Sequence, residues 1–437
     1  MNFSRFVKRF RPVLADPLER AGLRPGLYHY QREADGTQTR FHLRVDPSGA
    51  GLLLANATAA AWLAPSGVII AKGILDGDDD DLIAERLADC FRDVSFEVVA
   101  EDIRRVRRLV ATLAAPGDNY PIINLADPTF TPQLVPLGKP LSADVPLASP
   151  DQLVPLLDRL WDQGIPHVRI VAGAAPRADQ LVGAIERAED LGLIAGVRIR
   201  AMDLAEGDLL RRLALAGVDH IDLLYLSVSA AVHDGLAGPG DHSRAAELMD
   251  RIVENEVCPV AELGLVDATA ETIDETLEAL ARRGLRNVAA YAVATTEPGP
   301  SPALSARELI QTAEIVEAAA DRYGLRCLWY PPVRYDPDEG LAAQLRRGPR
   351  CSGDHAVRIE PDGRVIPARG PYRVAGNLLA QPWEEIGRSE VFRAYRERIE
   401  SDTRCDDCPG LALCAADCPR HPAGWADGWQ ERPGRLQ

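Results

Sequence analysis

Residues 167–202 read HVRIVAGAAPRADQLVGAIERAEDLGLIAGVRIRAM and contain the repeating unit of the largest part of this chain. The apolar run HVRIVAG predicts a short buried strand. The amphipathic run ADQLVGAIERAEDLG, which ends at a glycine, predicts a helix that leads into the next strand, GVRIRAM. A strand, a helix and a second strand in this order predict a βα unit, whose strands lie parallel in a buried sheet.

The same alternation extends over residues 120–332. Six such units predict an α/β fold, an incomplete (β/α)6 barrel of the TIM type. Active sites of such barrels lie at the carboxyl ends of the strands. A helix over residues 304–323 is followed by a last strand, LRCLWYPP. The other strand candidates are PIINL, HIDLLYLSV, PVAELGLV and NVAAYAVA.

Residues 27–115 predict a separate N-terminal unit. GLYHYQ, RFHLRVD and GLLLANA are typical of short strands separated by turns. The run ATAAAWLAPSG predicts a short helix stopped by Pro65 and Gly67, and LIAERLADCF and DIRRVRRLVATLA predict two more helices. Strands followed by three short helices indicate a small winged-helix-like domain. Residues 1–26 predict a helical segment packed on the body, with a membrane-surface helix as the alternative.

This order resembles the pyrroloquinoline-quinone peptide chaperone and its relatives, the RiPP recognition elements; RiPPs are ribosomally made, post-translationally modified peptides. The matching features are LLLANATAAAWL, the acidic turn ILDGDDDD and the closing helix. The resemblance implies that an edge strand captures the leader segment of a precursor peptide by strand addition. The alternative is a helix-rich domain that only packs on its neighbour.

Four cysteines near the C-terminus indicate a metal site. They follow the pattern C-x2-C-x5-C-x3-C within fourteen residues, and they are half of the eight cysteines in the chain. Short gaps let several sulfurs turn toward one metal centre. Buried cysteines or a disulfide are the alternatives. The four are Cys405, Cys408, Cys414 and Cys418.

These cysteines and the stretch RCSGDHAVRIEPDGRVIPARGPYRVAGNLL resemble SPASM, the auxiliary-cluster domain of radical S-adenosylmethionine (SAM) enzymes. Cys351, Gly363, Gly376 and Asn377 match its opening, which contains a hairpin ending in Pro-Asp-Gly. Two cysteines that the family expects are missing: Ala368 stands at one position, and no cysteine follows Cys418. The resemblance therefore leaves five metal ligands: Cys351, Cys405, Cys408, Cys414 and Cys418.

Five thiols cannot fill two four-thiolate sites. The resemblance assigns Cys405, Cys408 and Cys414 to one centre, and Cys351 and Cys418 to a second centre that lacks its ligand at position 368. We therefore expect at most one 4Fe–4S cluster, built on the first three cysteines. Its fourth ligand is Cys418, His421 or a small molecule. Zinc is the competing metal, because thiolates at short spacing also suit a tetrahedral ion.

The barrel resembles a radical SAM core that has lost its chemistry. Residues 233–247, HDGLAGPGDHSRAAE, and Asn124-Leu125 resemble segments of that core. The family then has three cysteines that hold the SAM-cleaving cluster, but this chain has no cysteine between Cys90 and Cys258. The family's Gly-Gly-Glu-Pro is Gly173-Ala174-Ala175-Pro176 here, and its Ser-Leu-Asp-Gly is Ser227-Val228-Ser229-Ala230. The resemblance thus implies a pseudoenzyme that does not use SAM.

No residue is assigned a catalytic role. His233 and Asp234 are adjacent in the sequence, and no nucleophile is spaced to join them, so we interpret both as structural. Cys90, Cys258 and Cys327 lie in apolar contexts and are expected in the core. The alternative for Cys327 is a position close enough to Cys351 to reach a cluster.

Composition excludes several classes of function. The 437 residues are 46% hydrophobic and 26% charged, with a net charge of −16. Such an acidic chain is not expected to bind nucleic acid or anionic lipid, which favour basic surfaces. No apolar run is long enough to span a bilayer, and residues 1–20 lack the features of a signal peptide. Cysteines grouped at metal spacing suit a cytoplasmic protein.

The sequence predicts four parts: a helical segment over 1–26, a recognition-element-like domain over 27–117, a partial barrel over 118–333 and a SPASM-like domain over 345–437. The first functional hypothesis is a non-catalytic partner protein in peptide maturation, which binds a precursor peptide, an active radical SAM maturase or both. The second is an iron–sulfur oxidoreductase or a SAM-independent peptide-modifying enzyme. The third is a zinc-stabilised interaction protein.

Overall fold

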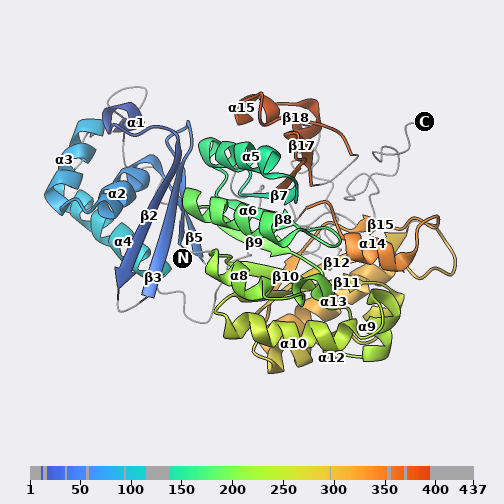
Figure 1. The fold of residues 1–437 in the computed structure, drawn as a ribbon. Coiled ribbons are helices and arrows are strands. Elements are labelled where there is room, and N and C mark those ends of the chain that lie inside the picture. The colour runs from blue at the N-terminus through green and yellow to red at the C-terminus, as the bar shows by residue number, and fades with distance from the viewer. Residues whose placement is uncertain are drawn as a thin grey trace. The chain divides into compact units, whose positions relative to one another are not determined.

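The computed structural model describes residues 11–12, 17–34, 37–55, 59–92, 95–114, 138–295, 297–351, 356–368 and 372–393. By their contacts the residues divide into two units, 1–122 with 161–166, and 123–160 with 167–437. In Figure 1 residues 11–114 of the first unit run from blue to cyan, residues 161–166 are green, and the second unit runs from green through yellow to orange. Each helix among the described residues falls short of the length or apolar character that crossing a membrane requires.

An antiparallel sheet in the order β2-β3-β4-β5 forms the first half of the first unit. The turn between its second and third strands contains Gly49, whose φ of 87° lies in the left-handed region that favours glycine. A separate two-stranded sheet joins β1 (Arg11–Pro12) to β6 (Phe91–Arg92). The four strands of the main sheet are β2 (Gly26–Ala34), β3 (Thr37–Val45), β4 (Gly51–Ala55) and β5 (Ala59–Leu63).

The helix predicted from ATAAAWLAPSG is wrong. Ala59–Leu63 form strand β5, in which Trp62 is paired with Leu52 of β4. Pro65 begins the next helix instead of stopping one. In the first turn of a helix the backbone N–H groups have no partner within the helix, so the missing N–H of proline costs nothing there, and its fixed φ already suits a helix. Pairing with β4 therefore outweighs the intrinsic helix propensity of these alanines.

Three helices complete the first unit: α2 (Pro65–Asp76), α3 (Asp80–Cys90) and α4 (Phe96–Ala114). Asp79 is the N-cap of α3. Its side chain accepts a hydrogen bond of 2.8 Å from the backbone N–H of Leu82. One face of α4 is apolar and buried in the same core as the sheet and α2. Two of these helices, α3 and α4, were predicted, whereas α2 was not. The winged-helix assignment stays a prediction.

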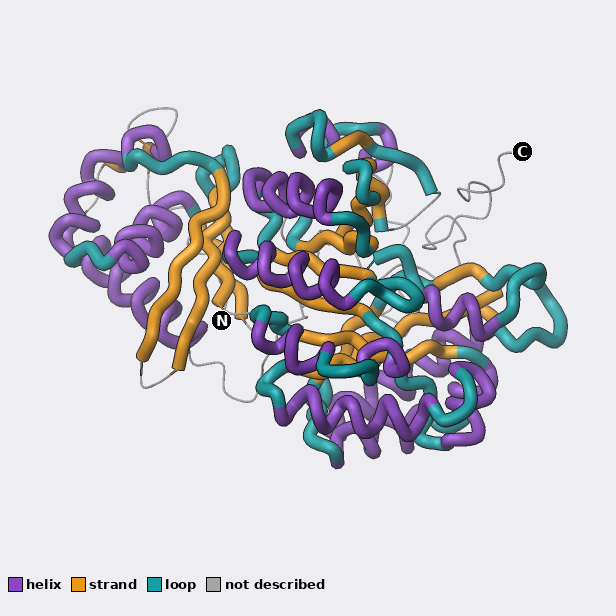
Figure 2. The backbone as a smooth tube through the Cα atoms, in the orientation of Figure 1, coloured by secondary structure: helices purple, strands orange, loops and turns teal. Residues whose placement is uncertain are grey.

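The second unit confirms the predicted α/β fold with a large parallel sheet. Its strands are joined by the helices that cover them, and Figure 2 shows these helices in purple around the orange strands. Along the sheet the order is β12-β11-β10-β9-β8-β7. These strands are β7 (Ser142–Pro146), β8 (His167–Val171), β9 (Ile194–Arg198), β10 (His220–Leu224), β11 (Cys258–Leu265) and β12 (Asn287–Thr295).

The first and last strands predicted for this unit have different outcomes. Strand candidate PIINL lies outside the described residues, whereas the unpredicted segment Ser142–Pro146 forms β7. The last predicted strand is present as β14 (Arg326–Trp329), which pairs with β12. The count of six βα units stays a prediction. The main helices are α5 (Pro150–Gln163), α6 (Ala178–Leu191), α8 (Leu209–Leu215), α10 (Asp241–Glu254), α12 (Ile273–Arg282) and α13 (Ala306–Tyr323).

The C-terminal segment extends the large sheet. The hairpin predicted before Gly363 is present: β16 (Ala356–Ile359) is antiparallel to β17 (Arg364–Pro367), and β16 is parallel to β7. Asn377 holds the turn, because its side-chain amide donates to the carbonyl of Asp362 at 2.8 Å. The remaining elements are α1 (Pro17–Arg20), α7 (Ala201–Leu204), α9 (Ala230–Ala237), α11 (Asp267–Ala270), β13 (Leu304–Ser305), β15 (Val333–Arg334), α14 (Leu341–Arg347), β18 (Gly376–Asn377) and α15 (Trp383–Ile386).

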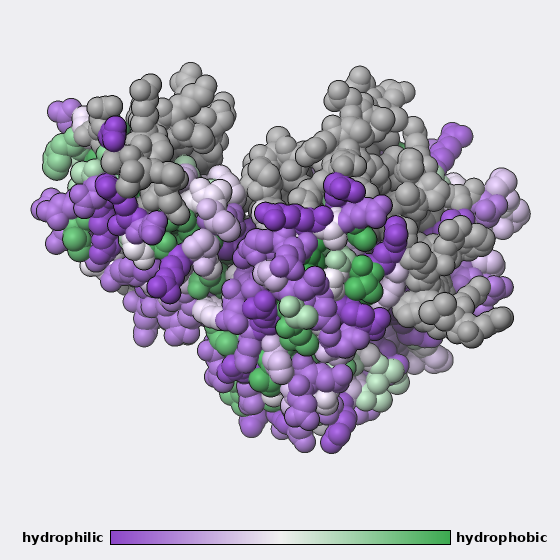
Figure 3. Space-filling view, turned by 90° about the horizontal axis from the view of Figure 1, so that it is seen from above, coloured by the Kyte–Doolittle hydropathy of each residue, from purple (hydrophilic) through white to green (hydrophobic). Residues whose placement is uncertain are grey.

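The face drawn in Figure 3 is largely hydrophilic where its residues are described, and its hydrophobic residues stand in small, separate groups. Single exposed apolar residues are normal on a soluble surface. The described surface in this view therefore gives no sign of a broad apolar patch.

Candidate functional site

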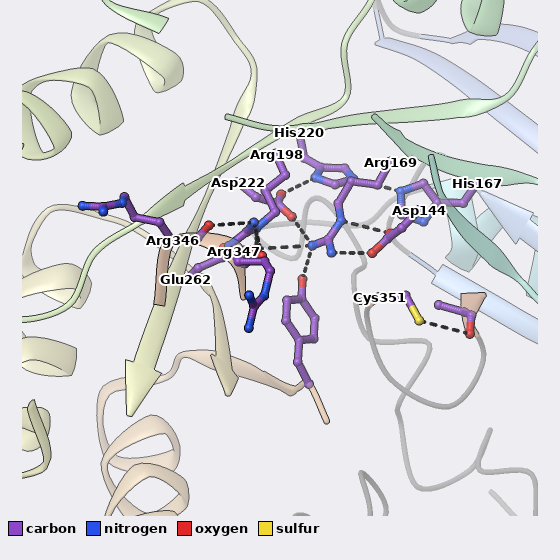
Figure 4. Close-up of polar contacts among 12 residues, drawn as sticks. Asp144, His167, Arg169, Arg198, His220, Asp222, Glu262, Arg346, Arg347 and Cys351 are labelled. Carbon is purple, nitrogen blue, oxygen red and sulfur yellow. Dashed lines mark hydrogen bonds and ion pairs between the residues drawn. The ribbon is translucent and has the colours of Figure 1, made fainter. Parts of the chain in front are cut away.

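The site with the most polar contacts among the described residues lies on one face of the large parallel sheet. It is built from polar residues on successive parallel strands, whose alternate side chains point to opposite faces of the sheet. The residues between them, such as Val168 and Ile221, are apolar and fully buried. Figure 4 shows the polar side chains converging from Asp144 on β7, His167 and Arg169 on β8, Arg198 on β9, His220 and Asp222 on β10 and Glu262 on β11.

Arg169 lies at the centre of this cluster. It donates two hydrogen bonds to the carboxylate of Asp144, from Nε at 3.1 Å and from Nη2 at 2.7 Å. Its Nη1 donates to Asp222 at 2.7 Å and to the hydroxyl of Tyr330 at 2.8 Å, and lies 3.4 Å from Glu262. Burial alone would lower the pKa of Arg169, but Asp144 and its other anionic neighbours hold it well above the usual value. The guanidinium is therefore permanently charged.

Arg198 connects the cluster to the end of helix α14. Its Nε contacts both carboxylate oxygens of Glu262, at 2.9 and 2.7 Å. Its Nη1 donates to the backbone carbonyls of Arg347 at 2.8 Å and Arg346 at 3.2 Å. These carbonyls belong to the last residues of the helix, where the dipole favours a cation. Arg198 thus holds the helix end close to the carboxyl end of β9.

Helix α14 also packs into the barrel through Leu345, which is fully buried. A Cβ on Gly264 would lie 2.5 Å from the Leu345 side chain, so the glycine makes room for it. The hydroxyl of Tyr291 donates to the carbonyl of Leu345. Residues of three strands, β9, β11 and β12, therefore hold the end of this helix against the large sheet.

Two histidines extend the network. Nε2 of His167 lies 2.9 Å from Nε2 of His220, and Nδ1 of His220 lies 2.7 Å from Asp222. Burial raises the pKa of Asp222, but His220 and Arg169 lower it to about 2, so the carboxylate is ionised. Burial, together with His220 and Arg169, holds the pKa of His167 well below its usual value. A hydrogen bond between the two facing nitrogens requires that one of them carries a proton and the other accepts it.

The charged groups of this cluster pair with one another. Two guanidiniums face three carboxylates, and each of the five groups has a charged partner inside the cluster. Buried charges require such pairing, because the loss of hydration is otherwise uncompensated. Across the ranges that the structure describes, no group of three or more His, Cys, Asp or Glu side chains could hold a metal ion. The cluster therefore suits internal stabilisation better than metal chemistry.

Of the predicted metal ligands, Cys405, Cys408, Cys414 and Cys418 lie outside the described residues, as does His421. Cys351 is described. It is fully buried with Ala356 and Ala368, and its Sγ lies 3.9 Å from the carbonyl of Ala356. Burial first, and then Asp144, raise the pKa of this thiol to about 12. Position 368 thus lies in one cluster with Cys351 but offers a methyl group. Of the two described positions that the resemblance assigns to the second centre, 351 offers a buried thiol and 368 offers no ligand atom.

The segments that resemble SAM-binding loops have other contacts. Ala175 has a φ of 46°, so the turn after β8 keeps a left-handed residue, but its side chain is a methyl group. The hydroxyl of Ser227 lies 2.8 Å from that of Thr272 and accepts from the N–H of Ser229 at 3.0 Å. The serine segment is therefore engaged by hydrogen bonds within the protein, whereas Ala175 is exposed and carries no polar side chain.

His233 and Asp234 have separate partners. Nδ1 of His233 accepts from the N–H of Leu226 at 3.0 Å, and its Nε2 lies 3.1 Å from Asp241. Asp234 accepts from the N–H groups of Gly240 and His242, at 2.9 and 2.8 Å. These bonds hold the loop before α10. Of the three cysteines expected in the core, Cys90 and Cys258 are buried and Cys327 is partly buried.

Sequence reasoning missed the whole Arg169 cluster. Its signal was present in HVRIV, GVRIR and HIDLL, where polar residues occupy every second position of strands that were interpreted as buried. A charged residue at alternate positions of a buried strand requires a buried partner. The pattern could have predicted a polar barrel interior, but not which residues pair.

Comparison with known proteins supports two parts of this description. Residues 351–409 match SPASM, an iron–sulfur cluster-binding domain. SuiB of Streptococcus suis bound to S-adenosylmethionine is similar in structure, with a TM-score of 0.51 and 12% identity over 89% of this chain and 94% of that chain. SuiB bound to precursor peptide SuiA gives a TM-score of 0.49 and 12% identity, over 86% and 95%. No curated protein matches the chain.

The predicted SPASM domain is thereby confirmed over residues 351–409. At 12% identity, the likeness to SuiB shows a shared α/β fold. The recognition element and the loss of radical chemistry stay predictions.

Proposed function

We propose that this chain is a non-catalytic, radical SAM/SPASM-like partner protein in the maturation of a ribosomally made peptide. It binds a precursor peptide, an active maturase or both, and it holds one auxiliary 4Fe–4S centre. In this role its barrel is a rigid scaffold and does not bind SAM. The proposal extends the SPASM match over residues 351–409 and the fold shared with a SAM-bound protein.

The observation that carries the proposal is that the charged side chains of the Arg169 cluster are already paired with one another. Barrel enzymes place their reacting groups at the carboxyl ends of the strands. Here Arg198, the last residue of β9, is engaged by Glu262 and by the carbonyls that end α14. A substrate that needed these groups would first have to break a buried ion pair, which is costly.

The residues at two resembled SAM positions support the same conclusion. Ala175 stands where the family has a glutamate that contacts the SAM amino group, and Ser229 stands where it has an aspartate. Neither alanine nor serine carries a negative charge, so neither can pair with an ammonium group. SAM is therefore not expected as a cofactor.

Peptide capture is supported by strand β2. It is nine residues long, and Gln31, Arg32 and Glu33 are exposed. Among the described strands, β3 pairs with one edge of β2 and none pairs with the other. The hydroxyl of Tyr30 donates to Asp76 of α2 at 2.9 Å, which holds the strand in place. A long, rigid strand with a free edge is a template for an added strand.

The metal centre in this proposal is built on Cys405, Cys408 and Cys414, with Cys418 or His421 as the fourth ligand. The description of the matched domain as iron–sulfur-binding favours iron over zinc. Thiolate clusters of this kind supply a stable cross-link and a site for electron transfer. Cys351 remains a core thiol outside the centre.

The decisive experiment is a SAM-cleavage assay. The protein is purified without oxygen, reconstituted with iron and sulfide, reduced with dithionite and given SAM. We expect no 5′-deoxyadenosine above the level without protein, while a SAM-cleaving radical enzyme under the same conditions produces it. Repeated turnover would overturn the proposal. A mass change in the precursor peptide without SAM would instead support a SAM-independent modifying enzyme.

A further inference from the structure

The unpaired edge of strand β2 presents two opposite charges side by side. Arg32 and Glu33 are exposed, and of the strands that the structure describes only β3 pairs with β2. Successive side chains of a strand point to opposite faces of its sheet. Arg32 lies on the face that carries α2, because it donates a hydrogen bond to that helix, and Glu33 therefore lies on the other face. The two charges cannot pair with each other.

Arg32 has no carboxylate partner among the described residues. Its Nη2 donates to the backbone carbonyl of Ile74, near the end of α2. A carbonyl accepts a hydrogen bond but does not neutralise a guanidinium. The two acids at the end of α2 each have another cation as partner: Asp76 pairs with Lys72, and Asp78 pairs with Arg86.

Glu33 likewise forms no ion pair within the part of the chain that the structure describes. On the same face, the register of β3 places a cation, Arg40, opposite Gln31. Arg40 is thus a diagonal neighbour of Glu33, and diagonal neighbours lie about 7–8 Å apart. A residue directly opposite Glu33 on an added strand would be closer, because its Cβ would lie about 4.5–5.5 Å away. The added strand therefore offers the better place for a counter-charge.

We infer that β2 captures a peptide segment in which a basic residue is followed by an acidic one, an inference that rests on the proposed function. The strand pairs of this sheet are antiparallel, and an antiparallel added strand continues that pattern. Its basic residue lies opposite Glu33, and the next residue, an acid, lies opposite Arg32. Opposite charges that face each other across two strands stabilise the pairing, whereas like charges destabilise it.

Two tyrosines select residues further along the captured segment. Tyr28 and Tyr30 lie on the same face as Arg32 and pack against the core of the unit. The hydroxyl of Tyr28 donates to the carbonyl of Arg24 at 2.8 Å, and that of Tyr30 donates to Asp76 at 2.9 Å. Both rings are thus held in place, and aromatic residues pair well with β-branched ones across strands. The segment therefore reads basic, acidic, any residue, β-branched, any residue, β-branched.

The first experiment uses the full-length protein and two labelled peptides of identical composition. One contains Lys-Glu-Thr-Val-Thr-Val between Gly-Ser flanks, and the other contains Glu-Lys-Thr-Val-Thr-Val between the same flanks. Because their net charge is the same, only the order of the two charged residues separates them. At low salt we expect the first peptide to bind about fivefold more tightly. High salt should reduce this difference, because exposed charges are screened.

Variants of β2 show whether these two residues read the order. R32E/E33R exchanges the charges and should reverse the preference, and R32Q/E33Q removes them and should abolish it. The control E278R/R282E exchanges an ion pair on α12, where the side chain of Arg282 is 74% exposed, and should keep the native preference. Equal binding of both peptides to the native protein, no binding of either, or an unchanged preference in R32E/E33R would overturn the inference.

A second experiment separates this inference from peptide capture itself. Precursor peptides encoded beside this chain are added, and hydrogen exchange is measured in Gly26–Ala34. Protection of β2, with tighter binding to the native protein than to R32E/E33R, supports both. If a precursor protects β2 but binds the two proteins equally, capture stands and the inference fails. If no precursor protects β2 in the native protein, capture fails, and the inference fails with it.

Discussion

The imidazole of His220 occupies the space above Gly196 of the neighbouring strand, where a Cβ would lie 2.1 Å from the ring. The glycine is thus a condition for the chain of hydrogen bonds from His167 through His220 to Asp222. Any larger residue at position 196 would displace the imidazole. This steric dependence can be tested directly.

We expect Gly196→Ala to destabilise the protein by about 1–3 kcal/mol, because it overpacks a buried site. The measurement is the free energy of unfolding from urea titrations of the full-length chain. Gly183→Ala is the matched control. It lies within α6, and its Cβ would meet nothing within 4 Å. Equal stability of the two variants would contradict the close contact.

Removal of the central cation should be more costly. Arg169→Met leaves Asp144, Asp222 and Glu262 without their shared partner, and breaking a buried pair in this way costs about 3–5 kcal/mol. The exposed variant Arg282→Met should change the free energy of unfolding by less than about 0.5 kcal/mol. Thermal and urea unfolding measure both. A loss below about 1 kcal/mol for Arg169→Met would show that the network is not a main source of stability.

Ionisation of Asp222 should make the free energy of unfolding depend on pH in the acid range. Its pKa is about 2 in the folded protein, whereas an unfolded aspartate titrates near about 3.9. The folded carboxylate holds its proton less tightly. Its stabilising effect is therefore complete above pH 4 or so, and is lost as the pH falls towards about 2. The amount is on the order of 2–3 kcal/mol.

The test compares the native protein with Asp222→Asn between pH 5 and pH 3. The variant should be less stable at pH 5, but its free energy of unfolding should fall less steeply with acid. Parallel pH profiles would show that Asp222 is not the responsible group.

Metal content should not depend on Cys351. Its thiol is buried in an apolar cluster with Ala356 and Ala368, and position 368 offers no ligand atom. We expect about four irons per chain after anaerobic reconstitution, both in the native protein and in Cys351→Ala. Cys408→Ala should lose most of the iron. Mössbauer spectroscopy and metal analysis check both results.

Other outcomes of the metal analysis are equally informative. Eight irons per chain, or half the iron in Cys351→Ala, would indicate a second cluster that includes this thiol. One zinc and no iron would retain the site with a different metal.

Much of the architecture was predictable because its signals are local. The alternation of apolar strands with amphipathic helices predicted the parallel sheet, and Pro361-Asp362-Gly363 marked the hairpin between β16 and β17. The resemblance of the cysteine motif and of the stretch from Cys351 to Asn377 to SPASM predicted the domain that residues 351–409 match. Ala59–Leu63 was mistaken for a helix, because pairing with β4 outweighs the helix propensity of alanine.

The sequence by itself therefore determined the alternation of strands and helices from β8 to β14 and the position of the cysteine motif, because periodicity, turn residues and ligand spacing act over a few neighbouring residues. Only the tertiary structure decided which charges meet inside the barrel. Strand register places Asp144 beside Arg169, 25 residues away, and the fold brings Glu262, 93 residues away, to the same guanidinium. Such partners are set by the packing of whole strands, and a buried charge is stable only where that packing supplies its counter-charge.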